Sequence, residues 1–298
     1  LAACASGPTH TDAFLRDAPG PGEDASEIPD GARVEGGAPV PPMDPEALAE
    51  AAVSFPLGVL AGDALADAAV TTTRFAGVGS LEPGLYVVEL DEAGAPARVA
   101  FDGPVTPDAD GYAHFDVTGL RPFARHRYAF VLREGGRAVR RSRVGHFRTA
   151  PASDAQPVVR FGGTSCTKQM YRPFPALGHA AARTDLDFFM HAGDHTYCDG
   201  ARTLEDFRAK YRENWTDPTL AAIHANAGGY NTWDDHEIDN NFNPETFDPA
   251  ALAAGYRAYF EHLPLRRDPA NPQRLWRSFR WGRTLELFVL DGRSERRP

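Results

Sequence analysis

The most restrictive feature of the sequence is an apolar run from Asp187 to Ala192 that leads directly into a carboxylate and a phenol. The run reads Asp-Phe-Phe-Met-His-Ala, which is typical of a buried strand. Asp194 and Tyr197 follow it at once. A carboxylate beside a buried strand must be paired, protonated or bound to a cation. We interpret this stretch as a cation site at the end of a strand.

Two further strand ends carry the same kind of side chain. The run 158–163 precedes Cys166, and the segment 230–237 contains Asp235 and His236. In open α/β sheets, binding sites form where the carboxyl ends of neighbouring strands meet. We therefore expect the three segments to converge. Taken singly, each signal has a simpler explanation, namely a turn, a small buried thiol or a helix cap.

The residue types suggest a centre with two metals. A thiolate at Cys166 or a phenolate at Tyr197 requires a strongly charged ion, for which ferric iron is suitable. The carboxylate of Asp194 can bridge two cations, and Asp235 can bind a harder ion such as calcium, magnesium or manganese. His236 is placed to give a proton to a leaving alkoxide.

Residues 54–149 are predicted to be all-β, because short alternating runs are separated by Gly, Pro and Asp clusters. This spacing favours a small antiparallel sandwich. No residue pattern in it indicates a site, so we interpret it as a packing domain rather than a ligand-binding module.

Residues 157–298 follow a linker, 150–156, and alternate strands with helices, which indicates an α/β domain. Thr203 with Asp206 forms a capping-box pattern, and two Asp-Pro pairs, at 217–218 and 248–249, predict further helix starts. A hairpin is expected around Gly282.

The first 52 residues differ in composition from the rest. They contain ten acidic and two basic residues, so they hold −8 of the net charge of −10. Residues 5–52 also contain eight Pro and six Gly, which predicts a disordered acidic tether. The start, Leu1-Ala2-Ala3-Cys4, is similar to a bacterial lipobox, which predicts lipidation at Cys4. A chance run of small residues is the alternative.

Composition excludes several function classes. The apolar share of 42% and charged share of 24% are ordinary for a globular protein of about two domains. There is no basic block that would indicate nucleic-acid binding. The three cysteines, Cys4, Cys166 and Cys198, argue against a disulfide framework, and Cys198 is expected to be inert packing.

The motif set resembles a known family. It is similar to the alkaline phosphatase D (PhoD-like) phosphatases, within the calcineurin-like, purple-acid-phosphatase-like metallophosphoesterases. The resemblance covers roughly 54–298. The motifs that carry it are Phe55-Pro-Leu-Gly-Val-Leu-Ala-Gly-Asp63, Ser165-Cys166, Asp187-Phe-Phe189, Gly193-Asp194-x-x-Tyr197, Trp233-Asp-Asp235-His236-Glu237-x-x-Asn240-Asn241 and Leu290-Asp-Gly-Arg293-Ser-x-x-Arg297.

The resemblance implies a phosphatase or phosphodiesterase acting on phosphate esters with Fe(III) and calcium. It implies that Cys166, Asp194 and Tyr197 hold the iron, that Asp235 binds the second metal with Asn241 as a lesser candidate, and that His236 is the proton donor. The expected fold is an N-terminal fibronectin-III-like sandwich followed by an αββα metallophosphoesterase-type domain. The expected location is the bacterial cell surface or periplasm, with a lipid anchor as the only membrane association.

We also expect the α/β domain to be represented by its N-terminal part alone, because the second half of such a sandwich does not follow the Leu290–Arg293 stretch. A chain of this kind is expected to be poorly stable and nearly inactive by itself. The alternative is a surface-anchored lipoprotein with a degenerate, non-catalytic phosphatase domain, and a hydrolase of other esters also stays open.

Overall fold

A six-stranded mixed sheet forms the centre of the protein in the computed structural model, which describes residues 42–294 and 296. The strand order is β5-β2-β1-β11-β10-β9. Strand β2 is antiparallel to both of its neighbours, β5 and β1, whereas β1, β11, β10 and β9 run parallel. The six strands are β1 (Val59–Gly62), β2 (Ala68–Arg74), β5 (Tyr112–Thr118), β9 (Phe161–Thr164), β10 (Phe188–Ala192) and β11 (Gly229–Thr232).

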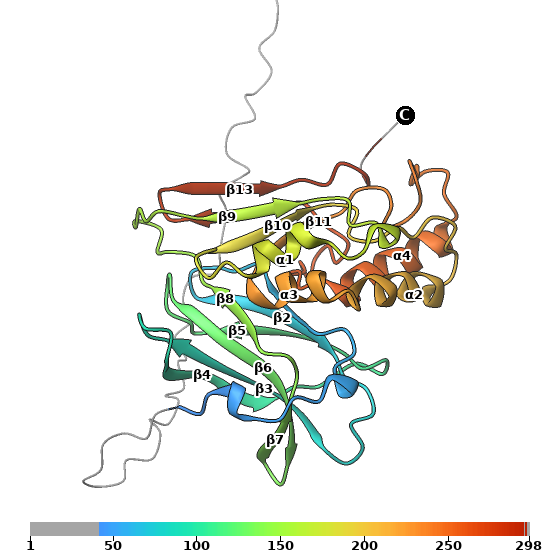
Figure 1. The fold of residues 1–298 in the computed structure, drawn as a ribbon. Helices are drawn as coiled ribbons and strands as arrows, with labels where there is room; N and C mark the ends of the chain where they lie inside the picture. The colour runs from blue at the N-terminus through green and yellow to red at the C-terminus, as the bar shows by residue number, and fades with distance from the viewer. Residues whose placement is uncertain (1–41, 295, 297–298) are drawn as a thin grey trace, which may run out of the picture. The chain divides into compact units, whose positions relative to one another are not determined.

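The antiparallel half of this sheet packs against a second, five-stranded sheet (Figure 1). Val59 and Ala61 of β1 share a core with Leu85, Val87 and other buried side chains of the facing sheet. The facing sheet has the order β4-β3-β6-β7, with β8 also paired to β6. Its strands are β3 (Glu82–Leu90), β4 (Pro96–Pro104), β6 (Arg125–Glu134), β7 (Arg137–Arg141) and β8 (Gly145–Arg148).

The parallel half carries helices on one face and a hairpin on the other (Figure 1). Alternation along β10 produces both contacts, since Phe189 packs in the helix core and Phe188 packs against Trp281 of the hairpin. The helices are α1 (Pro175–Ala181), α2 (Leu204–Trp215), α3 (Pro218–Asn226) and α4 (Pro249–His262), and the hairpin strands are β12 (Arg277–Trp281) and β13 (Leu285–Val289).

The helix starts confirm the capping predictions. Thr203 caps α2, and its hydroxyl and the Asp206 carboxylate form the expected reciprocal capping box. Asp217 and Asp248 cap α3 and α4, each directly before a proline at the first helical position. The expected hairpin around Gly282 is also present, with Arg277 paired to Val289 and Trp281 paired to Leu285.

The seam between the two halves of the large sheet depends on glycine. Gly62 of β1 pairs with Gly229 of β11. A Cβ atom at Gly62 would lie 2.7 Å from the Gly229 carbonyl oxygen and 2.7 Å from Pro264. Glycine at this position therefore permits the close approach that joins strands from the two predicted segments, 54–149 and 157–298, into one sheet.

The segment 150–156 is packed rather than a free linker. Ala150 is buried and its N–H donates to the carbonyl of Leu65 at 2.9 Å. The carbonyl of Ala155 accepts a hydrogen bond from the Arg283 N–H at 2.7 Å.

The end of the predicted tether forms short turns and ion pairs where the structure describes it. Residues 45–47 and 52–54 form single 3₁₀ turns, η1 (Pro45–Ala47) and η2 (Ala52–Ser54). Asp44 forms an ion pair with Arg127 of β6, and Glu50 forms one with Arg141 of β7. These contacts to basic side chains order residues that composition alone assigns to a tether. The predicted lipobox, Leu1–Cys4, and the tether before residue 42 lie outside the described residues.

No helix in the described part of the chain is both long and apolar enough to cross a lipid bilayer.

Candidate metal centre

Three loops converge at one edge of the large sheet, after the adjacent parallel strands β9, β10 and β11. The loops carry Cys166, Asp194 and Asp235, in that order along the chain. The Cys166 N–H donates to the Gly193 carbonyl at 3.0 Å, which joins the first two loops. Gly193 approaches the third loop so closely that a Cβ atom would lie 2.7 Å from the Asp234 nitrogen. The convergence predicted from three strand ends is therefore present.

Asp194 lies at the middle of the group of predicted ligands. Its Oδ2 accepts hydrogen bonds from the Cys166 thiol at 3.4 Å and from the Tyr197 hydroxyl at 3.1 Å. Its Oδ1 is 3.4 Å from the His236 backbone nitrogen. Asp194 is 5% exposed, whereas Cys166 reaches the surface. The thiol, phenol and carboxylate therefore meet at one point.

Asp235 extends this group toward the second metal position that we expect. Asp194, Asp235 and His236 each offer one ligand atom, and these three atoms lie within 4.8 Å of one another. The Asn241 backbone N–H donates to Asp235 Oδ2 at 2.6 Å, and Arg293 Nη2 lies 3.5 Å from Asp235 Oδ1. Burial opposes ionisation of Asp235, but these donors together lower its pKa below the ordinary value.

Asn241 contacts the centre through its backbone. Any residue except proline can provide that N–H, so a role for the Asn241 side chain as a ligand stays a prediction.

The backbone at the predicted ligands is strained. Cys166, Asp194 and Asn241 have φ angles of 61°, 57° and 53°, in the left-handed region that side chains with a Cβ seldom adopt. Such conformations persist where the surrounding structure imposes them, and they are concentrated at functional sites. At this site, the left-handed backbone accompanies the approach of the Cys166 side chain, the Asp194 side chain and the Asn241 N–H to one centre.

The site favours the protonated form of its phenol in the absence of a cation. Burial, then the charge of Asp194 and the neighbouring Cys166, raise the pKa of Tyr197. A bound cation would reverse the effect of these negative groups. The donor set therefore fits a positively charged ion.

Glu237, to which sequence reasoning assigned no role, connects two of the loops. Its side chain is fully buried, and its two oxygens accept from the His195 N–H at 2.5 Å and the Asp234 N–H at 3.0 Å. Burial raises the pKa of Glu237 to about 8. The signal in the sequence was its position in Asp-Asp-His-Glu, but no local pattern identifies partners 42 positions away.

Asp199 and Arg293 were also missed as parts of this site. Asp199 pairs with His236, and Arg293 forms ion pairs with Asp234 and Asp235. Arg293 follows β13, so the hairpin delivers a basic group to the three loops. For Asp199, the only signal in the sequence was an acidic residue shortly after Tyr197. For Arg293, the only signal was the Leu-Asp-x-Arg stretch.

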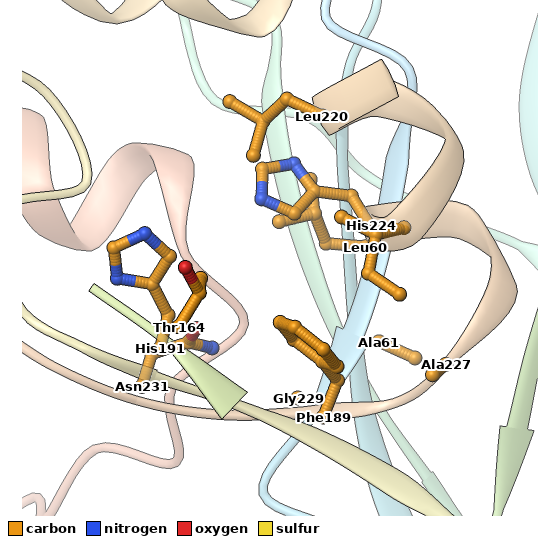
Figure 2. A pocket seen from close by; sticks show the side chains of 11 residues that line it. Leu60, Ala61, Thr164, Phe189, His191, Leu220, His224, Ala227, Gly229 and Asn231 are labelled. Atoms are coloured by element: carbon orange, nitrogen blue, oxygen red, sulfur yellow. The ribbon is translucent and has the colours of Figure 1, made fainter. Parts of the chain in front are cut away.

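A small internal cavity lies apart from this centre, between the sheet and α3 (Figure 2). His191 and His224 line it, together with apolar side chains such as Leu60 and Leu220. Burial lowers the pKa of both histidines to about 3, so they are neutral at physiological pH. None of the predicted metal ligands lines this cavity.

Cys198 is a free, fully buried thiol, consistent with the packing role expected for it.

Comparison with known proteins identifies the relatives of this chain. Residues 42–151 match the family model for the PhoD-like phosphatase N-terminal domain, and residues 161–298 match that for the PhoD-like phosphatase. Alkaline phosphatase D of Bacillus subtilis (strain 168) is 31% identical over an alignment of 280 residues, and the match covers 81% of this chain and 47% of the relative.

Two solved structures are also similar to this chain. A structure of PhoD has a TM-score of 0.70 at 30% identity, over 82% of this chain and 53% of that chain. Purple acid phosphatase PPD1 of yellow lupin (Lupinus luteus) has a TM-score of 0.55 at 15% identity, over 80% of this chain and 45% of that chain, which shows a shared fold. The chain thus spans about half the length of these relatives. Since the two family models match residues 42–151 and 161–298 in order, the chain belongs to the PhoD-like phosphatase family.

Proposed function

We propose that this protein is a metal-dependent phosphoesterase that hydrolyses phosphate esters with an activated water. The observation that carries the proposal is the meeting of Cys166, Tyr197 and Asp194, with Asp235 and His236 beside them. Family membership supports it further, since the similar Bacillus protein is an alkaline phosphatase by name.

We propose Fe(III) and calcium as the two ions. A thiol and a phenol gathered on one carboxylate support a ferric site at Cys166, Asp194 and Tyr197. Asp235 offers only oxygen, which supports calcium or another divalent cation as the second ion, with the carboxylate of Asp194 shared. Bound ions of this kind would lower the pKa of a water and polarise the phosphorus–oxygen bonds.

The chain's own residues would hold the site and move one proton. Arg293 fixes the carboxylates of Asp234 and Asp235 by ion pairs. As the water oxygen bonds to phosphorus and the bond from phosphorus to the ester oxygen breaks, the His236 imidazolium gives its proton to the departing alkoxide. The products are phosphate, or a phosphate monoester from a diester, and an alcohol.

We further propose that the sandwich is fibronectin-III-like and that the protein is exported with a lipid at Cys4. The strand orders β5-β2-β1 and β4-β3-β6-β8 support the first proposal. The Leu1-Ala2-Ala3-Cys4 sequence supports the second.

The test combines metal content with turnover. We expect the purified chain to bind iron and a divalent cation, and we expect whatever hydrolysis of 4-nitrophenyl phosphate or its diester it shows to depend on these ions. Cys166→Ala and Asp194→Asn should lose the iron, and any turnover should fall by about a hundredfold or more because the ions provide most of the rate enhancement. Metal content by mass spectrometry and initial rates measure this.

Cys198→Ala is the matched control, because Cys198 is a buried thiol that is not among the predicted ligands. It should keep the iron. A wild-type chain that binds no metal, or a Cys166→Ala variant that keeps iron and rate, would contradict the proposal and favour a non-catalytic binding protein.

A further inference from the structure

Lys168 brings a positive charge to the candidate metal centre. It lies two positions after Cys166, and its Nζ is 4.8 Å from the centroid of the Tyr197 ring. The hydroxyl of that ring donates to Asp194 Oδ2 at 3.1 Å. The ammonium group therefore lies beside the phenol that we propose as an iron ligand.

The loop is fixed to the protein on both sides of Lys168. The Thr167 N–H donates to the Asp194 carbonyl at 2.9 Å. Gln169 Oε1 accepts the Tyr197 N–H at 3.2 Å. The side chains of Thr167 and Gln169 are buried, whereas Lys168 is partly exposed. Because Lys168 has an extended backbone, its side chain points away from those of its two neighbours, toward solvent at the edge of the centre.

The charge of Lys168 is not neutralised by a carboxylate. No acidic residue in the described part of the chain forms an ion pair with it, and the contact that holds its ammonium is the one with the Tyr197 ring. Arg293 differs, because it is already paired with Asp234 and Asp235. A cation–π contact at an exposed site is weaker than a charge-assisted hydrogen bond to a phosphate oxygen. The ammonium is therefore free to turn from the ring to an anion that enters the centre.

We propose that Lys168 binds a non-bridging oxygen of the substrate phosphate and selects doubly charged phosphate monoesters over singly charged diesters. The proposal rests on the proposed phosphoesterase function. A lysine ammonium is a compact charge with three N–H donors, and its attraction to a phosphate grows with the charge of that phosphate. Above about pH 7, a monoester carries nearly one negative charge more than a diester. Lys168 makes and breaks no covalent bond, so it acts on binding.

The first measurement does not depend on turnover. Calorimetric titration with inorganic phosphate at pH 8 gives the dissociation constant for a doubly charged anion in the full, metal-loaded chain. We expect Lys168→Met to weaken phosphate binding about five- to thirtyfold, because a charge-assisted hydrogen bond at a partly exposed site is lost. Lys168→Arg keeps the charge and should stay within about threefold of the wild type. A wild type that binds no phosphate, or equal binding by Lys168→Met, overturns the proposal.

The second measurement compares 4-nitrophenyl phosphate with bis(4-nitrophenyl) phosphate, which have the same leaving group. We expect Lys168→Met to raise KM for the monoester about five- to thirtyfold and KM for the diester less than about threefold. The kcat values should change less than the monoester KM, because the lost contact is made in the bound substrate as well as in the transition state. Lys168→Arg should recover most of the monoester KM.

Arg140→Met is the matched control, since it removes one positive charge from an exposed side chain of β7 in the five-stranded sheet. It should leave phosphate binding and both KM values unaffected. Equal rises of both KM values in Lys168→Met would overturn the selection of monoesters by Lys168. Absence of any turnover in the wild type counts against the proposed function and leaves the phosphate titration to decide the role of Lys168.

Discussion

Single residues at the centre have structural tasks that are separate from binding metal. Glu237 is the clearest case, since it is fully buried and accepts two backbone N–H groups from different loops. Those loops contain Asp194 and Asp235. A buried acceptor that satisfies two donors stabilises the fold mainly because removing it leaves both donors without partners.

We therefore expect Glu237→Ala to lower the free energy of unfolding by about 2–4 kcal/mol, from two unsatisfied N–H groups and a cavity. Glu237→Gln keeps the shape and one acceptor, so its loss should be smaller. Urea unfolding measures both. Glu286→Ala, on the exposed face of β13, is the control and should stay within about 0.5 kcal/mol of the wild type. Equal stability of Glu237→Ala and Glu286→Ala would refute this role.

At the scale of elements, a buried ion pair attaches the hairpin to the large sheet. Arg277 of β12 donates to Asp63 just after β1 at 2.8 Å and 2.9 Å, and to the Asn231 carbonyl of β11 at 2.8 Å. Asp63 is fully buried and also accepts the Arg266 N–H at 2.7 Å. The pair therefore joins the hairpin to both strands of the glycine seam.

Removing both partners of this pair should cost less than the sum of removing each one alone. Arg277→Met leaves the Asp63 charge buried, and we expect a loss of about 3–5 kcal/mol in the free energy of unfolding. The double variant with Asp63→Asn should lose less than the sum of the single losses, because the remaining side chains are neutral. Asparagine is chosen because Asp63 has a positive φ of 46°.

A double-mutant cycle, measured by denaturant unfolding, gives the coupling free energy between Asp63 and Arg277. The surface pair Arg183–Asp185 serves as the comparison and should show little coupling, because both side chains are exposed to water. Additive losses at Asp63 and Arg277 would show that the pair does not hold the hairpin.

Local patterns in the sequence were sufficient to predict where helices and strands lie. They were insufficient to predict which distant residues contact one another. Caps such as Thr203 and Asp248 act within one turn, so the helix starts could be read directly. The meeting of Cys166, Asp194 and Asp235 followed from a rule about strand ends. The tasks of Asp199 and Glu237 depend on neighbours 37 and 42 positions away, which single-sequence patterns do not encode. The Asp63–Arg277 pair spans 214 positions for the same reason.

The whole molecule contains many buried histidines that are neutral when folded. Burial lowers the pKa of His126 to about 4 and that of His224 and His262 to about 3. In the unfolded chain, histidine has a pKa of about 6.5. The unfolded state therefore takes up protons first as the pH falls, which favours unfolding.

These histidines should lower the stability as the pH drops through 6.5 toward 4 and should leave it unchanged above about pH 7. Glu237 acts in the opposite direction, because burial raises its pKa from 4.5 to about 8, so it offsets the effect of about one histidine between these pH values and makes stability fall as the pH rises toward 8. At one pH unit below 6.5, each such histidine removes about 1.4 kcal/mol from the free energy of unfolding. Chemical denaturation across this range measures the slope. His126→Phe, which fills the site stacked on Phe147, should make the slope shallower by about one proton. A stability that is flat from pH 7 to 4.5 would contradict this account.

The glycine seam also has a consequence for the order of assembly during folding. Gly62 and Gly229 are 167 positions apart, and contacts of such separation form late because the intervening chain must first be brought together. Until then, β1 is an open edge with a row of free N–H and C=O groups next to a finished antiparallel sheet. Open edges recruit strands from other molecules. Refolding at high concentration is therefore most exposed to misassembly in the interval before β11 arrives, and the pairing of two glycines ends that interval.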